Sequence, residues 1–409
     1  MSEWLRGPSN GIALAFGDDA VRYGELARAV DAARLPSGDG PVGCPAGADP
    51  VTLITTVLAC LDRGRPVLVG TCRAEAEALG DALPDGTELA LQTSGSSDPA
   101  DTPRVVARTS DSWLASAAPL AELAGLSATD RIAVTGPLHV SMHLYAALHA
   151  LWLGASVGDG LEGATVVHAT PTRLSRLIDD RGRPPKAVVA GAAMSPRLRA
   201  QASVRGIRLT EYYGAAELSF VLAGAGDGLA PFPGVEVELR PGATGDEIWA
   251  RSPYLALGVI GGGMLRRTDD GFATVGDLAT RAAGGGIRVL GRGDAAITTA
   301  GATVLAEDVE ARLAALPGVA AAAVVGEPHE LLGERVVAIV ELADGAHLTD
   351  VVTAARGELD PAELPRRWFV RPVPRTASGK VARGRLRDAL ATGALGAGHA
   401  VPAPEGVRP

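Results

Sequence analysis

The sequence predicts an α/β protein with a large N-terminal domain and a small C-terminal α+β domain. A chain of 409 residues is too long for one compact core, so more than one domain is expected. From about residue 20 to residue 300, short β-branched runs alternate with amphipathic helical segments. Beyond residue 230 the pattern changes to strands separated by glycines, which indicates an antiparallel β subdomain at about 230–293.

The elements of the large domain can be assigned in order. Strands are expected at 87–93, 104–109, 130–135, 164–170, 187–191 and 207–213, where β-branched and apolar residues cluster. Helices are expected between them, at 110–125, 141–154 and 171–180. Strands that alternate with helices of this length are typical of a largely parallel sheet.

A second unit is expected to start at about residue 294. It contains a helical pattern at 306–316 and strands at 319–328 and 334–342, and about a hundred residues suffice for a small domain. The predicted boundaries are therefore 1–293 for the large domain and 294–392 for the small one. The segment 393–409 is rich in Gly, Pro and Ala and is predicted to be a disordered tail.

Composition excludes several classes of function. The net charge of −9 and the pI near 5.4 argue against a nucleic-acid binder, which usually carries a basic face. The three cysteines, Cys44, Cys60 and Cys72, are odd in number, and the first residues do not resemble a secretory leader. No run of about eighteen apolar residues exists. We therefore expect a cytoplasmic protein without a membrane span.

Three short pattern matches carry no function. Gly38–Gly43 satisfies G-x-G-x-x-G but contains a proline and follows no apolar strand. His139 and His143 have the spacing of zinc ligands on a helix, but the sequence offers no third ligand nearby. Gly379-Lys380 is no Walker A motif, because Pro374 stands where that motif needs glycine.

A hydroxyl-rich loop is the first candidate for chemistry. The apolar strand at 87–93 runs directly into Thr93-Ser-Gly-Ser-Ser97. Hydroxyls and flexible backbone amides in such a run can hold phosphate oxygens. Taken alone, the segment is equally well explained as a surface loop.

Four further motifs follow in order along the chain: Glu211-Tyr-Tyr-Gly-Ala-Ala-Glu217, Gly276-Asp277, Gly291-Arg-Gly-Asp294 and Pro374-Arg-Thr-Ala-Ser-Gly-Lys380. With the loop at 93–97 they resemble the core motifs of the adenylate-forming superfamily, which includes acyl-CoA synthetases, peptide-synthetase adenylation domains and luciferases. The resemblance covers about residues 17–390. The short N-terminal part is similar to that of o-succinylbenzoate–CoA ligase.

The resemblance implies a two-step reaction. A small, possibly aryl, carboxylic acid would attack the α-phosphate of ATP, giving acyl-AMP and pyrophosphate, with Mg²⁺ as cofactor. Coenzyme A, or the pantetheine of a carrier protein, would then take the acyl group. Transfer to an amine, and a degenerate member that binds nucleotide without full turnover, are the alternatives.

The resemblance also implies site residues. The nucleotide would be bound by Thr93, Ser94, Gly95, Ser96, Ser97, Gly191, Ala192, Ala193, Tyr213, Gly214, Asp277 and Arg292. Tyr213 would stack on the adenine, Asp277 and Arg292 would bind the ribose, and Glu217 would bind Mg²⁺, which favours carboxylate oxygen. Asp294 matches the hinge about which the small, mobile domain rotates.

Lys380 matches the lysine that catalyses adenylation in this superfamily. Among 38 lysines and arginines the chain has only two lysines, Lys186 and Lys380. A compact charge on a flexible stem can enter a site and withdraw in a way that the planar arginine fork cannot. Lys380 and Glu217 are therefore the predicted catalytic residues.

The acyl pocket is expected to be built from 136–154 and from the residues around 191 and 214–220. Its candidate residues are His139, His143, Gly191, Ala215 and Phe220. For the two histidines, core packing is an alternative, and so it is for Tyr213. Glu217 could instead be a carboxylate at a helix N-terminus, and Asp277 a turn residue.

Two departures from the superfamily pattern bear on the nucleotide site. The phosphate loop is longer than usual and reaches Pro103-Arg104 where the pattern has Pro-Lys. Thr298-Thr299 replaces the usual Ile-Lys after the hinge. The altered phosphate loop, together with the short N-terminal part, motivates the degenerate alternative.

Overall fold

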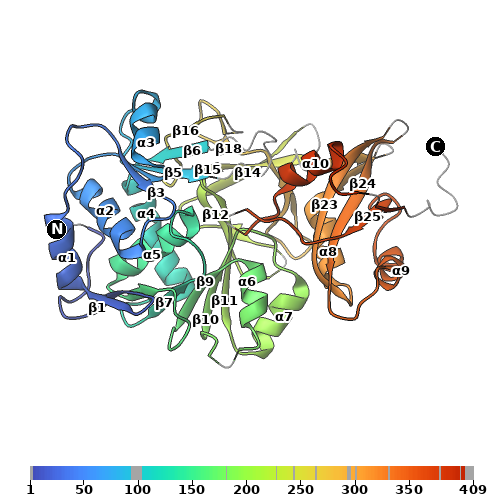
Figure 1. The fold of residues 1–409 in the computed structure, drawn as a ribbon, viewed down its shortest axis with the longest axis horizontal. Helices are drawn as coiled ribbons and strands as arrows, with labels where there is room; N and C mark the ends of the chain where they lie inside the picture. Colours follow the sequence, from blue (N-terminus) through green and yellow to red (C-terminus); the bar gives the residue numbers. More distant parts are fainter. Residues whose placement is uncertain are drawn as a thin grey trace.

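The computed structural model has a large α/β domain followed by a small domain, with a β subdomain between them (Figure 1). The residues that it describes are 3–93, 104–180, 182–226, 228–242, 245–262, 265–292, 296–299, 302–329, 332–376, 379–396 and 398–400.

A nine-stranded sheet forms the centre of the large domain, in the order β13-β12-β11-β10-β9-β7-β8-β1-β2. The strands from β11 to β1 run parallel along this path, while β2, β12 and β13 are antiparallel additions at the two ends. The bounds are β1 Ile12–Phe16, β2 Asp19–Arg22, β7 Arg131–Val134, β8 Ser156–Gly158, β9 Val166–Ala169, β10 Lys186–Val189, β11 Arg208–Ala215, β12 Ser219–Gly224 and β13 Ala230–Pro231.

Helices cover both faces of this sheet. Along β9, Val166 faces the core shared with α5 (Ser141–Leu153), while Val167 and Ala169 face α6 (Pro171–Leu177) and α7 (Pro196–Val204). Two buried faces explain why the inner strand β9 is mostly apolar on both sides. The helix ends follow sequence signals: Thr170-Pro171 and Ser195-Pro196 start α6 and α7 with a capping hydroxyl and a proline.

A second sheet of five strands, in the order β16-β6-β5-β4-β3, packs on the same core. Its bounds are β3 Val42–Pro45, β4 Val67–Gly70, β5 Leu89–Thr93, β6 Arg104–Arg108 and β16 Gly258–Ile260. The remaining helices of the large domain are α1 Tyr23–Ala32, α2 Pro50–Asp62, α3 Arg73–Leu79, a 3₁₀ turn Gly80–Ala82 and α4 Asp111–Ala124. The sequence predicted one largely parallel sheet, whereas the strands divide between two, and β6 is antiparallel to β5.

The β subdomain is an antiparallel sheet, as the glycine-separated strands predicted. Its order is β17-β18-β15-β19-β20, with β14 paired to β15. The bounds are β14 Glu236–Pro241, β15 Asp246–Arg251, β17 Arg266–Arg267, β18 Ala273–Thr274, β19 Asp277–Arg281 and β20 Ile287–Arg292.

The small domain has a six-stranded sheet with helices on both faces. Its order is β22-β21-β24-β25-β26, with β23 paired to β24. Ala322 and Val324 of β23 face the core shared with α8 and α9, and Ala323 and Val325 face α10. The bounds are β21 Ala296–Thr299, β22 Ala302–Leu305, α8 Ala306–Ala315, β23 Val319–His329, β24 Gly333–Leu342, α9 Leu348–Glu358, β25 Arg367–Val370, α10 Arg383–Ala391 and β26 His399–Ala400.

The end of the chain is described only in part. β26 lies within the segment 393–409 that was predicted as a tail, and it pairs with β25. Residues 401–409 lie outside the described residues. Within the described part of the chain, no helix is long and apolar enough to cross a membrane.

The small domain approaches the β subdomain closely at Gly291, in β20. A Cβ atom at this position would lie 2.6 Å from Oε2 of Glu307, in the first turn of α8, and the glycine has φ +108°. A larger residue would therefore be both strained and in collision. This glycine belongs to the Gly291-Arg-Gly-Asp motif in which the hinge is predicted.

Candidate active site

The predicted ribose residues come together where β11 meets the β subdomain. The Tyr213 hydroxyl donates a hydrogen bond of 2.7 Å to Oδ2 of Asp277. Asp277 is the first residue of β19, is 9% exposed, and its backbone pairs with that of Arg292. Three predicted nucleotide residues, from segments far apart in the chain, are thus adjacent. Asp277 is therefore a strand residue, and the alternative that it is a turn residue is wrong.

Glu217 lies in the turn between β11 and β12. Its backbone carbonyl accepts a hydrogen bond of 2.8 Å from the amide of Ala256, and Ser219 closes the turn with φ +57°, the left-handed region. The Glu217 side chain is only 5% exposed, and no described residue donates a hydrogen bond to its carboxylate. Because no helix begins here, the alternative role at a helix N-terminus is wrong.

The Glu217 carboxylate fits one ligand position for a hard cation. It is an anionic oxygen donor, nearly buried, whose hydrogen-bonding capacity is left open by the described residues. Among those residues, no group of three or more His, Cys, Asp and Glu side chains could hold a metal ion. A cation bound here would therefore need oxygens from the nucleotide and from water as well, which is the usual arrangement for Mg²⁺ with phosphates.

The segment Gly191-Ala-Ala193 follows β10 at the carboxyl end of the parallel strands. All three residues are exposed, and Gly191 has φ +91° beside Thr170. Ligands of open α/β sheets bind outside the carboxyl ends of the strands. The three small residues therefore lie at the edge where a ligand is expected.

The phosphate loop is mostly outside the described residues. Thr93 ends β5, and its hydroxyl donates to the carbonyl of Arg104 at 3.5 Å. Ser94, Gly95, Ser96 and Ser97 lie outside the described residues, and so does Asp294. Their predicted roles remain predictions.

The loop that carries Lys380 is a short hairpin. Arg375 and Val381 pair across it, the amide of Thr376 donates to the carbonyl of Lys380 at 2.8 Å, and Gly379 turns the chain with φ +81°. The Lys380 side chain is exposed. In the view of Figure 1 the segment before α10 extends from the small sheet toward the large domain.

Arg383 anchors this hairpin to α8, a contact that the sequence analysis missed. Its guanidinium makes ion pairs with Glu310 (2.5 Å) and Glu307 (3.2 Å), and the Arg383 and Glu310 side chains are 11% and 13% exposed. Arg383 stands three residues after Lys380, so the pairs fix one end of the lysine loop. The sequence did contain a signal for this contact: Glu307 and Glu310 stand three residues apart on a predicted helix, so both carboxylates lie on one face and can pair with the same cation.

One candidate acyl residue, Phe220, lies in a buried aromatic cluster. The ring of Phe220 is 5.0 Å from that of Tyr145, 4.6 Å from Tyr212 and 4.8 Å from Phe232. Ala215 is half-buried next to this cluster. His139 is half-buried, with Nδ1 3.2 Å from the carbonyl of Ala46.

Three buried histidines lie between α5 and the central sheet. Burial lowers the pKa of His143 and His149, on α5, to about 4, and that of His168, on β9, to about 3. Among the described residues, Nε2 of His143 and Nε2 of His168 find no hydrogen-bond partner, while Nε2 of His149 lies 2.8 Å from the carbonyl of Ala117. His143 is therefore a neutral, buried imidazole.

Because these histidines are buried in the neutral form, we expect the protein to become less stable as pH falls. Their folded pKa values lie below the ordinary value of 6.5, so the stabilisation is complete above pH 6.5 and is lost as pH falls toward 4. Each contributes a slope of about 1.4 kcal/mol per pH unit to the free energy of unfolding. His149→Gln, whose amide can donate to Ala117, should lose one such slope in urea titrations from pH 7.5 to 4.5. An unchanged slope would contradict the assignment.

The hydrogen bond between Tyr213 and Asp277 gives a second prediction. Tyr213→Phe keeps the ring that would stack on adenine and removes only the hydroxyl that holds Asp277. A hydrogen bond to a carboxylate contributes about 1.5–3 kcal/mol, so the KM for ATP should rise by roughly 10-fold or more. Initial-rate kinetics at saturating acid measure this effect, and an unchanged KM would show that Asp277 needs no such support.

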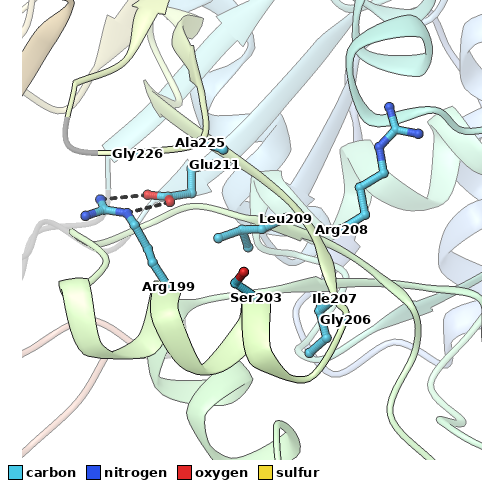
Figure 2. Close-up of a pocket in the computed structure, with 9 residues that line it drawn as sticks. All are labelled: Arg199, Ser203, Gly206, Ile207, Arg208, Leu209, Glu211, Ala225 and Gly226. Atoms are coloured by element: carbon cyan, nitrogen blue, oxygen red, sulfur yellow. Dashed lines mark hydrogen bonds and ion pairs between the residues drawn. The ribbon is translucent and has the colours of Figure 1, made fainter. Parts of the chain in front are cut away.

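A separate pocket of about 440 Å³ is lined by residues of α7, of β11 and of the segment after β12. Figure 2 shows the ion pair of Arg199 with Glu211 at one end and Arg208 pointing away from it. The pair is bidentate, at 2.6 and 2.9 Å, and Glu211 is nearly buried. None of its lining residues is a predicted site residue, and we assign the pair to the anchoring of α7 on β11.

Comparisons with known proteins agree with the motifs. The AMP-binding enzyme C-terminal domain matches residues 308–380. The chain is 28% identical over 361 residues to a Bacillus subtilis protein named uncharacterized acyl–CoA ligase YhfT, covering 79% of this chain and 74% of the relative. It is 28% identical over 378 residues to a Mycobacterium tuberculosis protein named probable 2-succinylbenzoate–CoA ligase, covering 84% and 96%.

The fold matches that of the Bacillus subtilis o-succinylbenzoate CoA synthetase MenE, solved in complex with the acyl-adenylate intermediate OSB-AMP. The TM-score is 0.77 at 20% identity, covering 95% of this chain and 98% of that one. The matched domain and these relatives show that the chain carries an AMP-binding enzyme C-terminal domain and is similar, over most of its length, to proteins named acyl–CoA and 2-succinylbenzoate–CoA ligases. The solved structures show that it shares their fold.

Proposed function

We propose that the protein uses ATP to activate a small carboxylic acid as acyl-AMP and then transfers the acyl group to coenzyme A. The observation that carries the proposal is the convergence of Tyr213, Asp277 and the Arg292 backbone at one end of the central sheet. These residues come from three of the motifs. The matched AMP-binding enzyme C-terminal domain and the relatives named acyl–CoA ligases support the same activity.

In the first step the acid's carboxylate oxygen attacks the α-phosphorus of ATP. A C–O–P bond forms, the bond to the β-phosphate breaks, and pyrophosphate leaves. Tyr213 and Asp277 would hold the adenosine, while the charge of Lys380 would stabilise the negative charge that develops on the α-phosphate oxygens. Mg²⁺, held in part by Glu217, would neutralise phosphate charge.

In the second step the thiol of coenzyme A attacks the acyl carbonyl. A thioester bond forms, AMP leaves with the electron pair of the acyl–oxygen bond, and the thiol proton passes to solvent or to a base. The predicted hinge at Asp294 would let the small domain withdraw Lys380 before this step. Gly291, packed against Glu307, lies three residues before that hinge.

We propose a compact, possibly aryl, acid as substrate. Small residues (Ala192, Ala193 and Ala215) and the Phe220 aromatic cluster would suit a flat or compact acyl group. The relative named 2-succinylbenzoate–CoA ligase points to an aromatic acid as the first compound to test.

A panel of aryl and short-chain acids in a pyrophosphate-release assay, with and without coenzyme A, tests the proposal. We expect acid-dependent pyrophosphate release and, with coenzyme A, a thioester detected by mass spectrometry. Release without thioester would favour a carrier protein or an amine as acceptor, and these can be supplied in turn. Absence of release with every acid would favour the degenerate alternative.

A further inference from the structure

A buried arginine lies directly beneath the turn that carries Glu217. Arg108 is the last residue of β6, and its side chain is 0% exposed. Burying a charge is costly unless it is paired or fully hydrogen-bonded. No described carboxylate forms an ion pair with Arg108, so other contacts must account for its presence.

Two of these contacts hold the turn on both sides of Glu217. Nη2 of Arg108 donates a short hydrogen bond to the carbonyl of Ala216, the residue before Glu217. Nη1 donates to the hydroxyl of Ser219 at 2.9 Å. Ser219 has a positive φ that a non-glycine residue rarely adopts, so the bond stabilises an otherwise unfavourable conformation.

The other contacts fix the guanidinium to the rest of the domain. Nη1 also donates to the hydroxyl of Ser112, on α4, at 3.0 Å and lies 3.5 Å from the carbonyl of Tyr254. The guanidinium carbon lies 5.0 Å from the centre of the Trp113 ring. The arginine therefore joins β6, α4 and the segment at 254 to the Glu217 turn.

Electrostatics connects Arg108 to the Glu217 carboxylate as well. Burial lowers the pKa of the Arg108 guanidinium to about 9, and the charge of Glu217 opposes this shift. No ion pair joins these two described side chains, so Arg108 holds the turn through its hydrogen bonds and does not occupy the Glu217 carboxylate.

We propose that Arg108 is a positioning residue that fixes the Glu217 turn in the conformation that receives metal-bound ATP. The proposal rests on the proposed function, because it gives Glu217 its role toward the metal. The bonds to Ala216 and Ser219 come from two separate nitrogens of the planar guanidinium, a geometry that the single ammonium nitrogen of lysine does not reproduce, so lysine should not replace Arg108. A merely structural arginine would support the core without affecting metal-dependent nucleotide binding.

Two serines give a matched test, because both accept a hydrogen bond from the same Nη1 atom. Ser219 belongs to the Glu217 turn, whereas Ser112 belongs to α4. We compare Ser219→Ala, Ser112→Ala and Arg108→Lys with the wild type. Calorimetric titration with ATP, in the presence and absence of Mn²⁺, measures binding without turnover.

We expect Ser219→Ala to weaken Mn²⁺-dependent ATP binding about 5-fold, which corresponds to one hydrogen bond, and Arg108→Lys to weaken it at least 10-fold. In the absence of Mn²⁺, the ATP affinity of Ser219→Ala and of Arg108→Lys should change less than about 2-fold. Ser112→Ala should bind ATP like the wild type, with or without Mn²⁺. Equal behaviour of the two serine variants would overturn the proposal. If Arg108→Lys does not fold, the serine pair still decides.

The outcome is separable from that of the proposed function. If the wild type released no pyrophosphate with any acid, the proposed activity would be contradicted, but the comparison of ATP binding among the variants would still be valid. Normal wild-type turnover, with Ser219→Ala and Arg108→Lys unchanged in Mn²⁺-dependent ATP binding, would remove only the role of Arg108.

Discussion

Lys380→Ala is expected to abolish formation of acyl-AMP while leaving thioester formation from supplied acyl-adenylate largely intact. Lys380 is exposed on a hairpin of the small domain, so its loss should disturb no packing. Loss of a preorganised charge of this kind costs about 10²–10³ in rate. Acid-dependent pyrophosphate release measures the first step, and thioester formation from synthetic adenylate measures the second.

Two variants control this experiment. Lys380→Arg keeps the charge but replaces the compact ammonium with a planar fork, and we expect it to be nearly as slow as the alanine variant. Arg356→Ala removes another exposed cation of the small domain, on α9, and should leave both steps unchanged. Wild-type pyrophosphate release by Lys380→Ala would remove Lys380 from the mechanism.

Glu217→Gln should impair the use of Mg²⁺-ATP far more than the binding of a stable acyl-adenylate analogue. The amide keeps the shape of the side chain but removes an anionic oxygen from a nearly buried position. We expect the KM for Mg²⁺-ATP to rise by about 10-fold or more, since a charged ligand to the cation is lost. Analogue affinity should change by less than about 2-fold.

The Mg²⁺ dependence of the rate distinguishes the two readings of Glu217. If it binds the cation, excess Mg²⁺ should restore part of the activity of Glu217→Gln. If it only supports the turn between β11 and β12, the losses in ATP use and in analogue binding should be equal, and added Mg²⁺ should restore nothing.

The parallel part of the fold could be predicted because its strands carry a local signal. The runs at 164–170, 187–191 and 207–213 are rich in β-branched and apolar residues and became β9, β10 and β11. The division into two sheets carries no such signal. The short connection between β5 and β6 did contain a clue, since a parallel crossover needs a dozen residues or more, and the two strands are indeed antiparallel.

The sequence motifs predicted which residues belong to the site, but not which of them contact each other. Tyr213 and Asp277 were both expected at the nucleotide, but nothing local shows that a hydrogen bond joins residues 64 positions apart. Arg108 could not be found this way. An arginine at the end of an apolar strand ordinarily indicates an exposed edge, and only the tertiary structure shows it buried beneath Glu217.

The scarcity of lysine has a practical consequence for the laboratory. Lys186 is held between Asp130, at 2.9 Å, and the carbonyl of Gly125, at 2.7 Å, so its ammonium is occupied. Lys380 is the exposed one. Apart from the chain's α-amino group, an amine-directed reagent should therefore label a single position. A fluorophore attached there would test, without any engineered cysteine, whether the small domain moves as the predicted hinge at Asp294 implies.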